Sequence, residues 1–211
     1  TLNFRLTAHE LAFMVKDSGC KLVFHDRDLA SVVAPLQGMT NVDHWIEMDA
    51  SGEGGAFEAA IADATPIWNQ VPQLESDLCM IMYSSGTTGT PKGVMFNHGQ
   101  FFFINAGSMG MAGASAKMVG LVALPLFHIG GLVAYTTITL GAGGTVVIER
   151  SFDAGRLLDT FDSAELGVTH FLGVPAMFNA MQAHPRFAST DFSRMITTAC
   201  GAESVPEALL R

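Results

Sequence analysis

The sequence predicts an α/β protein in which largely parallel sheets are flanked by helices. Short apolar runs alternate along the 211 residues with longer segments of helical periodicity, an order typical of strand–helix–strand units. Thr7 and Glu10 have the spacing of a capping box that starts a helix. The apolar run at residues 78–82 indicates a buried strand, which ends in a loop rich in glycine and hydroxyl side chains.

The first predicted portion comprises residues 1–77. After the capping box, Leu11, Met14 and Val15 fall on one face of a helix. Short apolar runs then alternate with segments of weaker helical periodicity. The predicted strands are 21–24 and 44–46, the predicted helices are 28–36 and 57–61, and residues 65–77, with two prolines and little periodicity, form a predicted connector.

The second predicted portion comprises residues 78–211 and carries the glycine-rich loop. The helix at 98–111 is expected to bury Phe101, Phe102 and Ile104. Pro175 opens another helix, at a position where proline is favoured. The predicted strands are 78–82, 119–124, 145–148, 168–172 and 195–198, and the predicted helices are 98–111, 131–140, 154–164, 175–183 and 204–211.

The composition argues against several functions. The net charge is −9 and no Lys/Arg cluster occurs, so no nucleic-acid partner is expected. Charged residues make up 15% of the chain, below the usual value of about 25%, which suggests packing against more protein. Cys20, Cys79 and Cys200 are far apart, so free thiols in a reducing cytoplasm are expected. The seven histidines lack metal-ligand spacing.

Residues 118–135 could be mistaken for a transmembrane helix. They contain one strongly polar side chain, His128, over a length that could cross a bilayer. However, Pro125 and three glycines interrupt the segment, and no cluster of positive residues flanks it. We therefore expect a buried strand, a loop and a buried helix here, and no transmembrane span.

The loop after the strand at 78–82 is the most informative segment. Residues 84–93 read Ser-Ser-Gly-Thr-Thr-Gly-Thr-Pro-Lys-Gly. Glycines let the backbone approach a ligand, N–H and hydroxyl groups donate to anionic oxygens, and Lys92 adds positive charge. The loop is not a Walker A motif, because Pro91 and Gly93 stand where that motif has glycine and a hydroxyl residue. A plain glycine-rich turn between two strands is the structural alternative.

These residues resemble the phosphate loop of the adenylate-forming superfamily, which includes acyl-CoA synthetases, luciferases and peptide-synthetase adenylation domains. The family signature, Thr/Ser-Ser-Gly-Thr-Thr-Gly-x-Pro-Lys-Gly, fits every position from Ser84 to Gly93. Glu203 and Ser204 depart from the alanine and proline that are more usual in the family. Further segments resemble the family in its own order over essentially the whole chain, at residues 3–11, 17–19, 124–131, 152–153, 168–170, 174–175 and 201–204.

The resemblance implies a set of site residues. Lys92, Thr88 and His128 would take part in catalysis, and Ser84 would share Mg²⁺ with an acidic residue outside this chain. His128 would also line the pocket of the acid with Val174 and Pro175, although a lone histidine in an apolar stretch is more often structural. The residues implied to bind the nucleotide are Ser84, Ser85, Gly86, Thr87, Thr88, Gly89, Lys92, Gly201, Ala202 and Glu203.

By the same resemblance, the chain would be a fragment of the layered N-terminal domain of an acyl-CoA synthetase. The start without methionine and the end inside a predicted helix also suggest a piece of a longer protein. The parent would join a carboxylic acid to CoA with ATP and Mg²⁺, through an acyl-adenylate, releasing AMP and pyrophosphate. The fragment alone is expected to be inactive, because it lacks the family's later motifs.

The resemblance leaves the acid substrate open. A fatty acid, such as a long-chain one, is favoured because the acyl-side segments are apolar and carry no obvious polar specificity residue. The alternatives are an aryl-acid ligase, a luciferase-like oxidase, a peptide-synthetase-type adenylation domain or, in another class, a non-catalytic nucleotide-binding or structural fragment. We expect a cytoplasmic protein, which could form a homodimer.

Overall fold

The computed structural model describes residues 1–49, 55–62, 64–68, 71–84 and 90–209. The chain divides into two compact units, Thr1–His98 and Gly99–Arg211, and each is considered by itself below. The predicted portions divide after residue 77 instead. The difference is the strand pair within residues 78–97, which belongs to the first compact unit. The predicted division after residue 77 stays a prediction.

The first unit begins with helices packed on a two-stranded parallel sheet. Its elements are α1 (Ala8–Asp17), β1 (Leu22–Asp26), the 3₁₀ turn η1 (Arg27–Leu29), α2 (Ala30–Met39), β2 (His44–Met48) and α3 (Ala56–Ala62). The capping box is confirmed, because Thr7 Oγ1 accepts from the Glu10 N–H and Glu10 Oε2 accepts from the Thr7 N–H. The five predicted elements of residues 1–62 are therefore present, with shifted ends.

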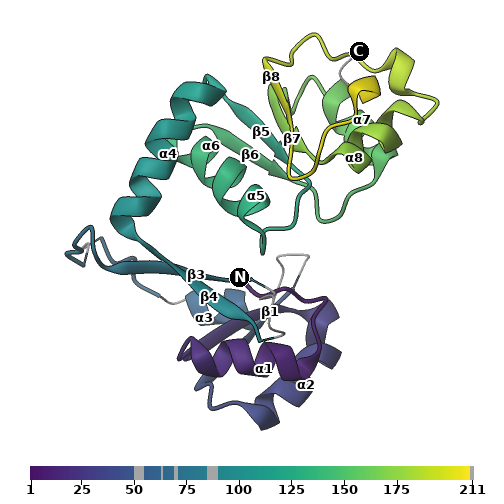
Figure 1. Cartoon of the computed structure of the whole chain (residues 1–211). Helices are drawn as coiled ribbons and strands as arrows, with labels where there is room; N and C mark the ends of the chain where they lie inside the picture. Colours follow the sequence, from purple (N-terminus) through teal and green to yellow (C-terminus); the bar gives the residue numbers. More distant parts are fainter. Residues whose placement is uncertain (50–54, 63, 69–70, 85–89, 210–211) are drawn as a thin grey trace. The chain divides into compact units, whose positions relative to one another are not determined.

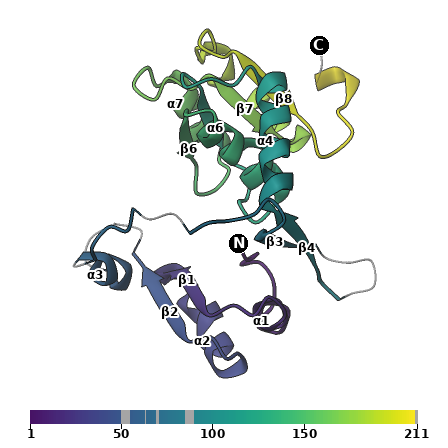
Figure 2. The same ribbon diagram turned by 90° about the vertical axis from the view of Figure 1, so that its left-hand side faces the viewer.

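The two faces of the β1–β2 sheet are covered by different helices. Val23 pairs with Trp45, and Phe24 pairs with Ile46, so alternate side chains reach opposite faces. Trp45 packs on the α1–α2 core, whereas the Phe24 ring lies 5.7 Å from that of Phe57 in α3. Figure 2 shows the two helix layers on either side of these strands.

The second sheet of this unit is a hairpin, formed by β3 (Leu78–Ser84) and β4 (Lys92–Asn97). The strands are antiparallel, with Tyr83 opposite Gly93 and Ser84 opposite Lys92. β4 is not among the predicted strands, because its first residues belong to the phosphate-loop signature. The Tyr83 hydroxyl donates to Asp17 Oδ2 at 2.6 Å, at the end of α1. Partial burial and the Asp17 carboxylate raise the pKa of Tyr83 to about 12.

The second unit contains a four-stranded parallel sheet in the order β6-β5-β7-β8. Its strands are β5 (Val119–Val122), β6 (Thr145–Ile148), β7 (His170–Gly173) and β8 (Thr197–Cys200). The helical segments are α4 (His98–Ala112), α5 (Ile129–Gly131), the π-helix η2 (Leu132–Thr137), α6 (Ile138–Gly141), α7 (Ala154–Asp162), α8 (Pro175–Gln182), η3 (Phe187–Ser189) and η4 (Glu207–Leu209). This order confirms the predicted α/β fold.

Neighbouring residues of β5 face two separate cores. Leu121 packs with Leu157, Phe161 and Phe171 beneath α7 and α8. Val122 packs with Tyr135 on the opposite face, beneath the continuous helix α5–η2–α6. Figure 1 shows α5 and α6 on one face of this sheet and α7 and α8 on the other.

Two expectations for the second unit are wrong. Phe102 and Ile104 of α4 are 66% and 37% exposed, because consecutive apolar residues point in different directions around a helix. The buried side of α4 carries Asn105 instead, whose Oδ1 accepts a hydrogen bond from Thr137 Oγ1 at 2.9 Å. The helix predicted from residue 204 is, within the described residues, only the short 3₁₀ turn η4.

His170, in β7, is a buried residue of the second unit. It is 1% exposed, its Nδ1 lies 2.7 Å from Thr169 Oγ1, and its Nε2 lies 3.2 Å from the Ala112 carbonyl oxygen. Because a carbonyl only accepts, Nε2 carries the proton, and neutral Nδ1 accepts from the hydroxyl. Burial lowers the pKa of His170, which favours this neutral form.

Acid should therefore destabilise the chain through His170. The folded-state pKa lies below the ordinary value of about 6.5, so the unfolded chain takes up the proton first as the pH falls. The free energy of unfolding should fall from about pH 6.5 downward, as the pH approaches the lowered pKa. In denaturation measured across this range, His170→Gln should weaken the pH dependence, and the exposed-residue control His44→Gln should keep it. Equal pH dependence of wild type and His170→Gln would contradict the assignment.

Candidate nucleotide and acid site

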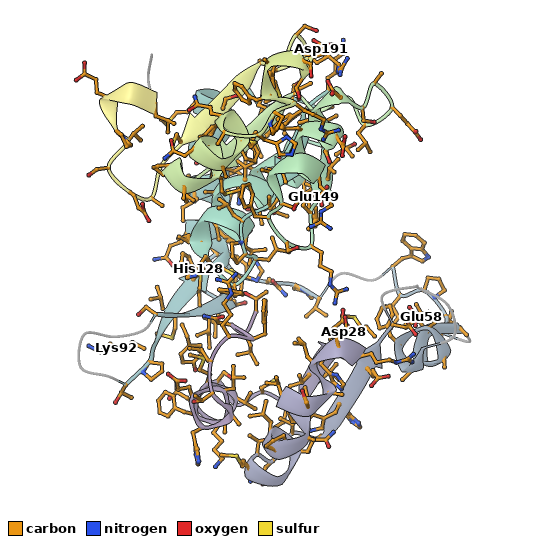
Figure 3. All side chains as sticks on the ribbon, turned by 90° about the vertical axis from the view of Figure 1, so that its right-hand side faces the viewer. Asp28, Glu58, Lys92, His128, Glu149 and Asp191 are labelled. Carbon is orange, nitrogen blue, oxygen red and sulfur yellow. The ribbon has the colours of Figure 1, made fainter. Side chains whose placement is uncertain are left out.

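The phosphate-loop signature closes the β3–β4 hairpin of the first unit. Ser84 ends β3 and Lys92 begins β4, and these two exposed residues are register partners. Figure 3 shows Lys92 at this end of the hairpin. The predicted residues between them, Ser85, Gly86, Thr87, Thr88 and Gly89, lie outside the described residues. The structure therefore places a hydroxyl and a primary amine at the two ends of the predicted phosphate loop.

The hairpin distinguishes this loop from the phosphate loop of P-loop nucleotide-binding proteins. In those proteins the loop leads from a strand into a helix, whose N-terminus faces the phosphates. Here the signature leads into the strand β4. A plain turn between strands has the same topology, so the residue types of the loop, rather than the hairpin, favour phosphate binding.

Gly93, the last glycine of the signature, also has a packing role. A Cβ atom at this position would lie 2.8 Å from Ile81 Cγ2 and 3.3 Å from the ring of Tyr83. A side chain at this position would therefore crowd the side chains of β3, which glycine avoids.

The other predicted site residues meet at one edge of the second unit's sheet. His128 follows β5, Val174 and Pro175 follow β7, and Gly201, Ala202 and Glu203 follow β8. These strands are parallel and adjacent, so their carboxyl ends share an edge, where ligands bind in open α/β sheets. The structure therefore brings these residues to one side of the unit, as a candidate acid and nucleotide edge.

His128 is exposed at the start of α5. Its backbone N–H donates to the Pro125 carbonyl at 3.1 Å, and its carbonyl accepts from the Leu132 N–H at 3.1 Å. Its ring lies 4.8 Å from the ring of Phe127, which is buried. The backbone is thus fixed on both sides, while the imidazole faces solvent and is free to meet a ligand.

Gly131 sets the path of the chain around His128. A Cβ atom at Gly131 would lie 2.5 Å from the Pro125 carbonyl oxygen and 2.7 Å from that of Leu124. At the adjacent Gly130, an added Cβ would only meet Leu124 Cδ1 at 3.6 Å, an ordinary contact. The close approach of α5 to the preceding loop therefore requires glycine at 131 and not at 130.

The two glycines give a matched pair of variants. Gly131→Ala should lower the free energy of unfolding by about 1–3 kcal/mol, as overpacking does. Gly130→Ala should leave it unchanged or raise it by up to about 1 kcal/mol, because alanine favours a helix. Chemical denaturation of both variants beside wild type checks this difference. Equal stability of the two variants would show that the loop adjusts to the added methyl group.

The turn after β8 has a strained backbone. Ala202 has a φ angle of +70°, which is uncommon for residues other than glycine. The N–H of Gly201 donates to the Gly173 carbonyl at 3.2 Å, so β7 holds the turn in place. Ala202 and Glu203 are exposed. Such strain is often found at ligand sites, which agrees with the predicted nucleotide contact.

Sequence reasoning missed two polar groups of this unit. Glu149, labelled in Figure 3, follows β6 at the same sheet edge. Its Oε1 accepts from Thr160 Oγ1 at 2.9 Å. Its position directly after the predicted strand at 145–148 is the sequence feature that could have identified it. Tyr135 is buried, and its hydroxyl has no hydrogen-bond partner. The sequence placed Tyr135 in a buried helix but could not show that its hydroxyl lacks a partner.

The described residues near the loop could support Mg²⁺ only weakly. Mg²⁺ is usually held by carboxylates together with substrate phosphates, and Ser84 offers one hydroxyl. Among the described residues, no group of three or more His, Cys, Asp or Glu side chains could hold a metal ion. Ser84 and Lys92 fit phosphate oxygens better than a bare cation.

None of the helices in the described ranges combines the length and apolar character needed to span a bilayer.

Comparison with known sequences identifies the family of the chain. The family of AMP-binding enzymes matches residues 1–211. A feruloyl-CoA synthase of Amycolatopsis sp. is 35% identical over 208 residues, which are 97% of this chain and 39% of that protein. The long-chain-fatty-acid–CoA ligase FadD13 of Mycobacterium tuberculosis is 31% identical over 222 residues, covering 100% of this chain and 41% of that protein. The chain thus spans about two fifths of these relatives.

Solved structures show the same fold. The inhibitor-bound N-terminal domain of FACL13 from Mycobacterium tuberculosis matches with a TM-score of 0.83 at 30% identity, covering 99% of this chain and 51% of that chain. ATP-bound MatB from Rhodopseudomonas palustris matches with a TM-score of 0.80 at 27% identity, covering 95% of this chain and 39% of that chain. The chain belongs to the family of AMP-binding, adenylate-forming enzymes, whose relatives are acyl-CoA synthetases and ligases.

Proposed function

We propose that this chain is part of an ATP-dependent acid–CoA ligase. The observation that carries the proposal is the signature at residues 84–93, which closes an antiparallel hairpin with Ser84 and Lys92 as its end pair. The match of the family over residues 1–211 supports it. The proposed substrates are a carboxylic acid, ATP and CoA. A cytoplasmic location and a homodimer stay predictions.

The proposed reaction has two steps. A carboxylate oxygen of the acid attacks the α-phosphorus of ATP, and the bond to pyrophosphate breaks, which gives an acyl-adenylate. The CoA thiol then attacks the acyl carbon, loses its proton, and AMP leaves. No protein nucleophile is required, so the contribution of the chain is to position groups and stabilise charge.

The loop residues would act on the leaving phosphates. Lys92 and the hydroxyls of Ser84, Ser85, Thr87 and Thr88 would donate to the β- and γ-phosphates, and Gly86 and Gly89 would let backbone N–H groups come close. When bound, Mg²⁺ would neutralise phosphate charge. Gly201, Ala202 and Glu203 would contact the adenine side, and His128 with Val174 and Pro175 would face the carboxylate and the acid chain.

Two acid classes are candidates. The apolar acyl-side segments favour a fatty acid, the substrate class in the name of FadD13. The buried hydroxyl of Tyr135, which has no hydrogen-bond partner among the described residues, favours an aryl acid with a polar substituent, the aryl class being that in the name of the feruloyl-CoA synthase. A panel of both classes is therefore the informative experiment.

The test is CoA-dependent release of AMP by the full-length parent, with fatty and aryl acids offered in parallel. We expect AMP to appear only when an acid, ATP and CoA are all present. The 211-residue chain, tested beside the parent, should form no acyl-adenylate, because the family's later motifs are absent from it. Release of ADP instead of AMP with every acid would contradict the proposal. Formation of an acyl-adenylate by the 211-residue chain would contradict its expected inactivity.

A further inference from the structure

Tyr135 carries a buried polar atom without a hydrogen-bond partner. The residue is 6% exposed, and less than 1 Å² of its hydroxyl oxygen is accessible. Among the described residues, Glu58 Oε2 and Arg194 Nε are also unpartnered, but both side chains carry further polar atoms, and the Nη2 of Arg194 donates to the Phe161 and Asp162 carbonyls. In Tyr135 the unpartnered atom is the side chain's only polar group, and such groups in native proteins call for an explanation.

The helix that carries Tyr135 begins at the candidate acid and nucleotide edge. The helix α5–η2–α6 starts beside His128, at the carboxyl end of β5, and runs back along the sheet. Helical side chains lean toward the N-terminus of their helix, so Tyr135 leans toward this edge. Its cluster includes Val122, the last residue of β5, with Leu126 and Leu172 from the same edge, and also Met118, which precedes β5.

Within the part of the chain that the structure describes, no group satisfies the hydroxyl. The apolar members of its cluster are Ala114, Met118, Val122, Leu126, Val146 and Leu172, whose side chains cannot form a strong hydrogen bond. Phenylalanine would fill the same space without a buried donor, so the hydroxyl is costly for the fold alone. Tyr135 also lies in the π-helix η2, an uncommon conformation frequently found at functional sites.

We propose that Tyr135 determines acid specificity, its hydroxyl donating a hydrogen bond to an oxygen on the acid substrate remote from the carboxylate. The substrate class is then an oxygenated aryl acid, rather than an unsubstituted fatty acid. Leu126 and Leu172 are only partly buried, and their side chains would have to move aside for the ring of the acid to enter. This inference rests on the proposed acid–CoA ligase function.

The test compares Tyr135→Phe with wild type in the full-length parent. The acids are ferulic acid, cinnamic acid, which has the same skeleton without ring oxygens, and octanoic acid. Wild type should prefer ferulic acid, and Tyr135→Phe should lower kcat/KM for it by about tenfold, mainly through KM, as expected for one lost hydrogen bond. The values for cinnamic and octanoic acids should stay within about twofold, since neither presents a ring oxygen.

Stability gives a second readout. Tyr135→Phe should leave the melting temperature unchanged or raise it, because an unpaired buried donor is removed. Tyr83→Phe is the matched control, since the other tyrosine of the chain donates to Asp17, and it should lower the melting temperature. An unchanged ferulic-to-cinnamic ratio in Tyr135→Phe, or a lowered melting temperature, would overturn the proposal. Wild type inactive with all acids would instead overturn the ligase function, and the inference with it.

Discussion

Lys92→Ala in the full-length parent is expected to slow acid-dependent adenylation by about 10²–10³-fold, the loss typical of removing one donor to developing charge. Lys92 opens β4 opposite Ser84, at the end of the predicted phosphate loop. Its charge should act on the phosphates as pyrophosphate leaves, so kcat should fall more than the affinity for ATP. The measurement is pyrophosphate exchange into ATP, in the presence of a substrate acid.

Lys21→Ala is a suitable control for this prediction. Lys21 is an exposed lysine of the same unit, whose Nζ lies 4.0 Å from Asp43 Oδ2, and an exposed pair of this kind contributes little. Its loss should leave the exchange rate within about twofold. Thr88→Ala, within the same signature, should also slow the exchange strongly. A wild-type rate of pyrophosphate exchange in both Lys92→Ala and Thr88→Ala would contradict the assignment of residues 84–93 as a phosphate loop.

His128→Ala is expected to impair use of the acid rather than of ATP. The exposed imidazole lies at the carboxyl end of β5, on the edge shared with Val174 and Pro175. Losing one hydrogen bond to a charged carboxylate costs about 1.5–3 kcal/mol, which corresponds to about a tenfold to hundredfold loss in kcat/KM for the acid. The KM for ATP should change little.

Steady-state kinetics with each substrate varied in turn checks this expectation. His44→Ala, which removes an exposed histidine from β2, should behave as wild type. The contrast with Lys92→Ala matters as well, because one variant should affect the acid and the other the phosphates. If His128→Ala kept the wild-type kcat/KM for every acid, the histidine would have only a structural role.

Local sequence patterns predicted most of the parallel sheet. The strand at 145–148 has the predicted bounds, and the capping box at Thr7 and Glu10 is present. These features depend on near neighbours in the chain, which sequence reasoning can follow. β4 was missed because Lys92 and Gly93 are typical of a loop, and only the pairing with Tyr83 and Ser84 makes them a strand.

Burial was harder to predict than element type. Phe102 and Ile104 are exposed although they are apolar, while Asn105 of the same helix is buried and accepts a hydrogen bond from Thr137. The candidate edge could be inferred in part, since His128, Val174 and Gly201 each follow a predicted strand. The missing partner of the Tyr135 hydroxyl could not, because it depends on six apolar neighbours brought together from distant parts of the unit.

The most direct test of the central claim follows the oxygen atoms of the acid. The full-length parent would be given ATP, CoA and an acid whose carboxylate carries heavy oxygen. If the carboxylate attacks the α-phosphorus, one labelled oxygen must remain on AMP when CoA takes the acyl group, and mass spectrometry should find it there. Unlabelled AMP, or label in free phosphate beside ADP, would contradict acid activation through an acyl-adenylate.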